Sequence, residues 1–257
     1  MWFDSHCHLD SQYFPGEAQA AALERARAAG VEGFVCIGVG GAAAMREAVA
    51  AAEADPAVWA TVGVHPHDAT SLDAPLEAVL REYLAHPRVK ALGEVGLDHH
   101  YDHSPRGVQR EVFARMIALA RETRKPLVIH TREAPLETLE LLTSEGAREV
   151  GGVIHCFSED RAFAERSLDL GFDLSFSGIV TFKSARAIQE VAAWAPLERI
   201  LLETDSPYLA PVPVRGKPCE PSLLVHTAAR VAELRGLSLQ ELAQHTTENT
   251  RRRFGLA

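Results

Sequence analysis

The sequence lacks the features of a membrane or secreted protein. No apolar run approaches the roughly 18 residues that span a membrane, and no secretory leader follows Met1. Cysteine is scarce and forms no Cys-x-x-Cys pair, so we interpret the thiols as small buried hydrophobes in a reducing compartment. These absences predict a cytoplasmic protein without a membrane segment. The cysteines are Cys7, Cys36, Cys156 and Cys219.

An excess of positive charge is also absent. Lys and Arg number 26 against 35 Asp and Glu, and the formal net charge is −9. This balance argues against broad electrostatic binding of nucleic acid, which requires a basic face. It still allows an enzyme that takes one phosphodiester into a metal-filled pocket, because bound divalent ions reverse the local sign of the charge.

The chain does contain a regular alternation of apolar strand-like runs and helix-period segments. Its 257 residues are close to the roughly 250 typical of a (β/α)8 barrel. We therefore predict a single-domain TIM-type barrel over residues 1–257 with an extra C-terminal helix. The expected strands cover residues 2–4, 33–39, 59–64, 90–95, 127–130, 152–155, 172–176 and 200–203. The expected helices cover residues 15–29, 42–54, 72–86, 105–124, 134–145, 159–170, 185–195 and 222–234, followed by 238–253.

Candidate metal ligands lie at the ends of five expected strands. His6 and His8 are two positions apart, so a strand presents both imidazoles on one side. In a closed parallel barrel the carboxyl ends of all strands open on one face, which brings distant ligands together. Imidazoles with carboxylates suit zinc, manganese or iron, and the carboxylates also allow magnesium. The candidates are His6, His8, Glu94, His130, His155 and Asp205.

Six candidate ligands exceed what one tetrahedral metal site needs. We therefore expect two divalent ions (Mg, Mn or Zn), about 3.5–4 Å apart, with one carboxylate between them. Glu94 is the expected bridge, because the fourth strand lies between the first strand and the fifth and sixth.

Six ordered segments give the sequence a family resemblance. The chain resembles the TatD family of metal-dependent deoxyribonucleases, within the amidohydrolase superfamily of (β/α)8 barrels, along essentially its whole length. The resemblance implies hydrolysis of DNA phosphodiester bonds, stepwise from a 3′ end, with magnesium or another divalent ion. The segments are Phe3-Asp-Ser-His-Cys-His8, Gly63-Val-His-Pro-His67, Gly93-Glu-Val-Gly-Leu-Asp98, His130-Thr-Arg-Glu-Ala134, His155-Cys-Phe157 and Glu203-Thr-Asp-Ser-Pro-Tyr-Leu209.

The resemblance also implies roles for individual residues. His6, His8, Glu94 and Asp205 would bind one metal, and Glu94, His130 and His155 the other. His65 matches a family position near the scissile phosphate. Lys183 lies on the loop after the seventh strand, where it would contact substrate or be a solvated residue at a helix start.

One segment departs from the family pattern. Where the family commonly reads Arg-Gly-Lys-Arg-Asn-Glu-Pro, this chain reads Arg215-Gly-Lys-Pro-Cys-Glu-Pro221. Arg215 and Lys217 remain as phosphate contacts, whereas Pro218 and Cys219 replace a cation and an amide. We expect this departure to affect substrate preference more than chemistry.

For the reaction itself, we expect metal-activated water to attack phosphorus, with Asp205 as general base and Glu94 and His65 in the catalytic site. His65, Arg215 and Arg132 would orient the phosphate, since a guanidinium can bond two oxygens at once. Single-stranded or frayed ends are the expected substrate, because a deep barrel mouth admits no intact duplex. Aromatic residues near the mouth would stack unpaired bases or pack their loops onto the barrel. These residues are Tyr13, Phe14, Tyr101, Phe157, Phe182 and Tyr208.

Two rival functions remain open at this point. The same barrel could serve an amidohydrolase-type esterase or amidase that acts on a small molecule or on aminoacyl-tRNA. Many such enzymes bridge two metals with a modified lysine at the end of strand four, where this chain has Glu94. A non-catalytic barrel would predict loss of ligands, and all six are present. Nothing in the sequence implies an obligate protein partner.

Overall fold

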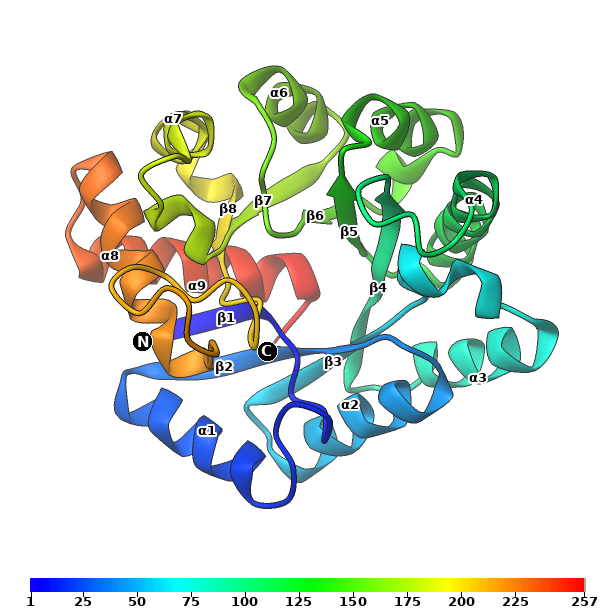
Figure 1. The fold of residues 1–257 in the computed structure, drawn as a ribbon, viewed down its shortest axis with the longest axis horizontal. Coiled ribbons are helices and arrows are strands. Elements are labelled where there is room, and N and C mark those ends of the chain that lie inside the picture. The colour runs from blue at the N-terminus through cyan, green and yellow to red at the C-terminus, as the bar shows by residue number, and fades with distance from the viewer. Residues whose placement is uncertain (257) are drawn as a thin grey trace.

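The computed structural model describes residues 1–256. Within this range eight parallel strands pair in chain order from β1 to β8, with helices α1 to α8 around them (Figure 1). The barrel closes just beyond β8, where the His8 N–H donates to the Ser206 carbonyl at 2.8 Å and the Asp205 N–H to the His6 carbonyl at 3.0 Å. The predicted TIM-type barrel is confirmed. Its strands are β1 (Trp2–Cys7), β2 (Val31–Gly38), β3 (Val58–Val62), β4 (Val89–Asp98), β5 (Leu127–Arg132), β6 (Gly152–Ile154), β7 (Phe172–Phe176) and β8 (Ile200–Leu202).

Every predicted helix is present, including the extra one at the C-terminal end. Between residues 1 and 256 no helix has the length and apolar character that crossing a membrane requires. The assignment of the whole chain to one domain stays a prediction. The helices are α1 (Ala18–Ala28), α2 (Ala42–Ala54), α3 (Ala74–Leu84), α4 (Arg106–Thr123), α5 (Pro135–Ser144), α6 (Arg161–Asp169), α7 (Arg186–Trp194), α8 (Leu224–Arg235) and α9 (Leu239–Phe254).

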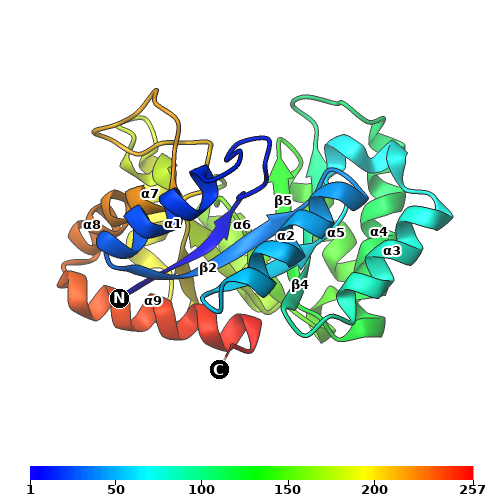
Figure 2. The same ribbon diagram turned by 90° about the horizontal axis from the view of Figure 1, so that it is seen from below.

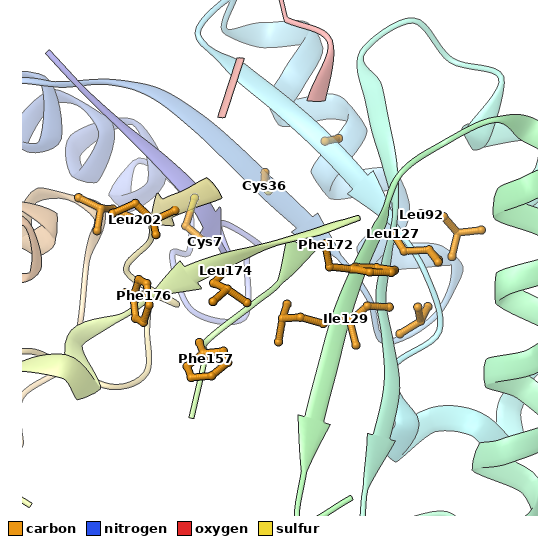
Figure 3. Packing of buried hydrophobic residues seen from close by; sticks show 14 of the residues in the cluster. Cys7, Cys36, Leu92, Leu127, Ile129, Phe157, Phe172, Leu174, Phe176 and Leu202 are labelled. Atoms are coloured by element: carbon orange, nitrogen blue, oxygen red, sulfur yellow. The ribbon is translucent and has the colours of Figure 1, made fainter. Parts of the chain in front are cut away.

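The main apolar core lies between the strands and the surrounding helices. Alternate strand residues such as Phe172, Leu174 and Phe176 of β7 point into this layer and are fully buried (Figure 3). Cys7 belongs to the same layer, so its side chain faces away from the barrel interior, as predicted. The two neighbours of Cys7, His6 and His8, are thereby directed to the interior.

A second, smaller apolar cluster fills the barrel interior near the amino ends of the strands. Phe254 of α9 is 3% exposed and belongs to this cluster, and α9 runs across that end of the barrel (Figure 2). Asn249 of α9 donates to the Ile200 carbonyl at 2.9 Å, and Arg253 reaches the buried Asp173 carboxylate at 2.7 Å. The last helix therefore seals the end opposite the loops. The cluster contains Phe3, Val35, Ile37, Ala91, Val128, Val153, Leu201 and Phe254.

Irregularities in β1 and β4 change which side chains face the interior. The pairing of β4 with β5 shifts register between Gly93 and Val95, and that of β1 with β2 shifts between Asp4 and Cys7. An extra residue in a strand redirects the side chains that follow it, a common device beside functional sites. Gly96 lets β4 approach β5 closely after this shift, because a β-carbon at Gly96 would lie 1.9 Å from the His130 carbonyl oxygen.

Candidate metal centre

All six predicted ligands meet inside the mouth of the barrel, at the carboxyl ends of the strands. His6 lies on β1 and His8 directly follows it, Glu94 lies on β4 and His130 on β5, while His155 follows β6 and Asp205 follows β8. His6 is fully buried and Glu94 is 3% exposed. The structure thus brings together residues that the sequence separates by as many as 199 positions (205 − 6). Their roles as metal ligands stay a prediction.

Glu94 separates two groups of imidazoles with its two carboxylate oxygens. Oε1 lies 2.7 Å from His155 Nε2 and 2.8 Å from His130 Nδ1. Oε2 faces the other way, 3.5 Å from His6 Nε2 and 3.9 Å from His8 Nε2. One carboxylate oriented toward both groups is the arrangement that a bridging ligand requires.

Asp205 completes the group that faces Oε2 of Glu94. Its Oδ1 lies 3.6 Å from His6 Nε2 and 3.7 Å from His8 Nε2. Ligand atoms of His6, His8 and Asp205 all lie within 4.8 Å of one another, as do those of His65, Glu94 and His130. The two triads have no residue in common, and Glu94 of the second also faces His6 and His8 of the first.

Two buried carboxylates that sequence reasoning did not assign stand behind the histidines near Oε1. Asp98 Oδ2 lies 3.1 Å from His130 Nε2, and Glu203 Oε1 lies 3.4 Å from His155 Nδ1. A metal-ligating imidazole usually donates its second N–H to such a group, which fixes the ring and increases its basicity. The alternation of side chains along a strand could have identified both carboxylates in the sequence, because residues an even number of positions apart point to the same side. Asp98 lies four positions after Glu94, and Glu203 lies two positions before Asp205.

Glu203 also offers an alternative position for a cation. Its carboxylate groups with His6 and His155 within 4.8 Å, and the rings of those two histidines stack at 3.9 Å. However, Glu203 Oε1 already accepts the Cys156 N–H at 2.6 Å. We therefore assign Glu203 the supporting position behind His155.

Protonation in this cluster follows from burial and from the neighbouring charges. Burial alone would raise the pKa of Glu94, but the imidazoles of His155, His65 and His130 hold it well below its usual range. Burial lowers the pKa of His8 to about 3, and burial with the nearby His155 also lowers the pKa of His6. His6 and His8 are therefore neutral, with lone pairs available to a cation.

The donor set fits a divalent cation. Nε2 of His6, which faces the carboxylates of Glu94 and Asp205, is buried without a hydrogen-bond partner. Burying such atoms unpaired costs free energy that coordination would offset. Neutral imidazoles on one side and the carboxylates of Glu94 and Asp205 on the other are the ligands that zinc or manganese take.

Of the predicted phosphate contacts, His65 is the one placed within the cluster. Its Nε2 lies 3.4 Å from Glu94 Oε1, and its Nδ1 accepts the His67 N–H at 3.1 Å. The ring hydrogen is therefore assigned to Nε2. Arg132 is exposed and lies over the Tyr101 ring, with 4.7 Å from its guanidinium carbon to the ring centroid.

The remaining predicted phosphate contacts lie farther out. Arg215 stacks on Phe182 at 4.1 Å, and Lys183 and Lys217 are exposed. In the departure from the family pattern, Pro218 is exposed whereas Cys219 is buried. Contacts of these outer cations with phosphate stay a prediction.

Comparisons with known proteins agree with this geometry. A family model described as TatD related DNase matches residues 3–255. The chain is 41% identical over 254 residues to the uncharacterized metal-dependent hydrolase YabD of Bacillus subtilis, covering 99% of each chain. It is 34% identical over 260 residues to the 3′-5′ ssDNA/RNA exonuclease TatD of Rahnella sp., covering 99% of this chain and 98% of the other. The crystal structure of YJJV, a TatD homologue from Escherichia coli K12, superposes with a TM-score of 0.93 at 29% identity, covering 100% of this chain and 98% of that one.

Proposed function

This chain belongs to the TatD family and is a metal-dependent hydrolase, and from that premise we propose that it is a 3′-5′ exonuclease of single-stranded DNA. The observation that carries the proposal is the position of Glu94, whose two oxygens face two separate groups of imidazoles. Two cations held about one carboxylate suit in-line displacement at phosphorus. The names of two relatives, each called a 3′-5′ ssDNA/RNA exonuclease, also support it.

We assign one divalent ion to His6, His8, Asp205 and Glu94, and the other to Glu94, His130 and His155. When bound, such ions would polarise the phosphate and lower the pKa of water toward ~7. Asp205 would accept the proton of the attacking water, since it is a carboxylate of the centre that lies on a different element from Glu94.

His65 would position the substrate. With Nδ1 occupied by the His67 N–H, its Nε2–H is free to donate to a phosphate oxygen beside Glu94. Burial lowers the pKa of His65, so the ring is a neutral donor. Arg215 and Lys217, on the loop after β8, would attract the strand by charge.

The test uses metal-stripped protein with single-stranded DNA labelled at the 3′ or the 5′ end. Magnesium, manganese or zinc should restore stepwise release of mononucleotides from the 3′ end, and a His6→Ala variant should not be restored. Release from the 5′ end would contradict the polarity. If no metal restores cleavage, the nuclease proposal fails, and aminoacyl esters and small amides are the substrates to assay next.

A further inference from the structure

The structure sorts the aromatic side chains at the barrel mouth into packing residues and exposed ones. Phe157 is 1% exposed and belongs to the apolar layer, and Phe14 and Phe182 pack against that layer. In contrast, Tyr101 is 52% exposed and Tyr208 is 46% exposed. About half of each of these two side chains is therefore left exposed by the fold.

Tyr101 contacts His67, which shares the Asp98 carboxylate with the predicted ligand His130. The Tyr101 N–H donates to Asp98 Oδ1 at 2.8 Å, and its ring meets the edge of His67 with 5.5 Å between centroids. The exposed His103 lies nearly parallel to the ring, at 5.5 Å and 22°, and Arg132 lies over it. Together these groups form an aromatic and cationic surface next to the metal centre.

Tyr208 is fixed on the other side, beside the histidines near Oε2. Its N–H donates to the Asp205 carbonyl at 2.9 Å, and its hydroxyl hydrogen-bonds that of Tyr13. Its ring meets the edge of His8 with 5.9 Å between centroids. Tyr208 therefore contacts a predicted metal ligand directly.

The two rings flank the centre from opposite sides of the mouth. Tyr101 follows β4 and Tyr208 follows β8, and these strands are half a turn apart in the order of the barrel. Their loops rise at the same end of the molecule, on either side of the β1–α1 loop (Figure 2). A strand whose phosphate lay at Glu94 would carry one base toward each ring.

We propose that Tyr101 and Tyr208 are stacking surfaces for the bases of the two nucleotides that flank the scissile phosphate. This inference rests on the proposed function and adds which part of the substrate the two tyrosines would bind. Aromatic stacking accepts any base, because every base has a π face, and Arg132 adds a cation–π contribution. The enzyme would thus recognise unpaired nucleotides without reading their sequence.

Replacing each tyrosine with leucine tests the proposal on strands that carry an abasic residue. Tyr101→Leu and Tyr208→Leu should each lower kcat/KM on an intact strand about five- to a hundredfold. Each loss should disappear when the abasic residue replaces one of the two flanking nucleotides, a different one for each variant. Tyr101→Phe keeps the ring, so its loss on an intact strand should be smaller than that of Tyr101→Leu. Leu239→Ala, at an exposed side chain at the start of α9, is the control that should behave as wild type.

Wild-type activity in both leucine variants would overturn the proposal, as would equal losses on intact and abasic strands. A binding measurement separates this outcome from failure of the nuclease proposal. A dinucleotide that contains 2-aminopurine and a hydrolysis-resistant phosphorothioate linkage should lose fluorescence through stacking when it binds to magnesium-loaded wild-type protein. Quenching that disappears in the Tyr101→Leu and Tyr208→Leu variants supports the inference even without cleavage, and absence of quenching in the wild-type protein refutes it.

Discussion

Asp98 and His130 form a buried contact in which the carboxylate Oδ2 lies 3.1 Å from the ring Nε2. The opposite nitrogen of that ring, Nδ1, lies 2.8 Å from Glu94. The same Oδ2 also lies 3.0 Å from His67 Nε2, while Oδ1 accepts the Tyr101 N–H. One carboxylate therefore orients a candidate metal ligand and anchors the loop that carries an exposed tyrosine.

Asp98→Asn should weaken metal binding about 10- to 100-fold, because the second nitrogen of His130 loses a charged acceptor. The asparagine side chain has nearly the same volume and keeps one oxygen that can accept the Tyr101 N–H of the loop. Titration calorimetry with manganese or zinc measures the affinity directly. Asp102→Asn is the matched control, since Asp102 is exposed and pairs with Arg106 at 2.7 Å. Equal affinities in the two variants would show that Asp98 serves the loop alone.

Asp205→Asn should lower turnover about 10²- to 10⁴-fold while the protein stays folded, because the variant loses a proton acceptor and one carboxylate of the proposed metal centre. The backbone favours this substitution, since Asp205 has φ of 55°, a conformation that asparagine also tolerates. Single-turnover cleavage and circular dichroism provide the two readouts. Near-normal cleavage by this variant would remove Asp205 from the role of base.

Divalent metal should stabilise the folded protein, because the centre forms only in the native state. At a metal concentration of about 100 times Kd the gain is about 2.7 kcal/mol, seen as a rise in Tm that a chelator reverses. Glu94→Gln should lose most of this rise, since Glu94 faces both groups of histidines. Glu133→Gln, at an exposed side chain, should keep it. A full metal-induced rise in the Glu94 variant would contradict the bridging position.

Alkaline pH should destabilise the protein through Cys36. Burial raises the pKa of this thiol to about 12 from a reference value of 9.0. Between those values the folded chain keeps a proton that the unfolded chain has released, so the free energy of unfolding falls as pH rises. Between about pH 8.5 and 10.5 wild type should lose about 2 kcal/mol more than Cys36→Ala. Urea unfolding at the two pH values checks this, and parallel losses would contradict it.

Phe254→Ala should cost about 3–5 kcal/mol of stability, because it opens a void in the small interior cluster. Phe254 is the last residue of α9 and belongs to the interior cluster near the amino ends of the strands, away from the metal centre, so kcat per folded molecule should stay unchanged. Chemical denaturation and active-site titration separate the two effects. A lower kcat with intact metal binding would mean that the two ends of the barrel are coupled.

Apolar runs predicted every strand, because burial on both faces gives parallel strands a clear signal. The predicted strand ends were less accurate where polar residues of a strand pair with the neighbouring strand. β4 was expected to stop at residue 95 but continues to Asp98, which pairs with Arg132 of β5. The carboxylate behind His130 was missed for this reason. The bulge at Glu94 also leaves no mark in the sequence, since it depends on hydrogen bonds to the neighbouring strand.

The site itself was more predictable than its surroundings. Convergence of His6, Glu94 and Asp205 follows from barrel topology, which places all strand ends on one face. The contact of Glu203 with His155 joins residues 48 positions apart (203 − 155) and depends on side-chain packing. The contact of Arg132 with Tyr101 depends on the conformation of the loop after β4, which the alternation of side chains along a strand does not predict.

The seal formed by α9 leaves one end of the barrel for a substrate to approach. Phe254 and its apolar neighbours fill the interior near the amino ends of the strands, and α9 covers that end (Figure 2), so a substrate would reach the centre from the loop end. A polymer substrate would then enter, and its product leave, at the same end of the barrel. For the proposed exonuclease, a cleaved nucleotide would have to leave before the shortened strand could advance, and the rate of product release would limit how fast the enzyme moves along a strand.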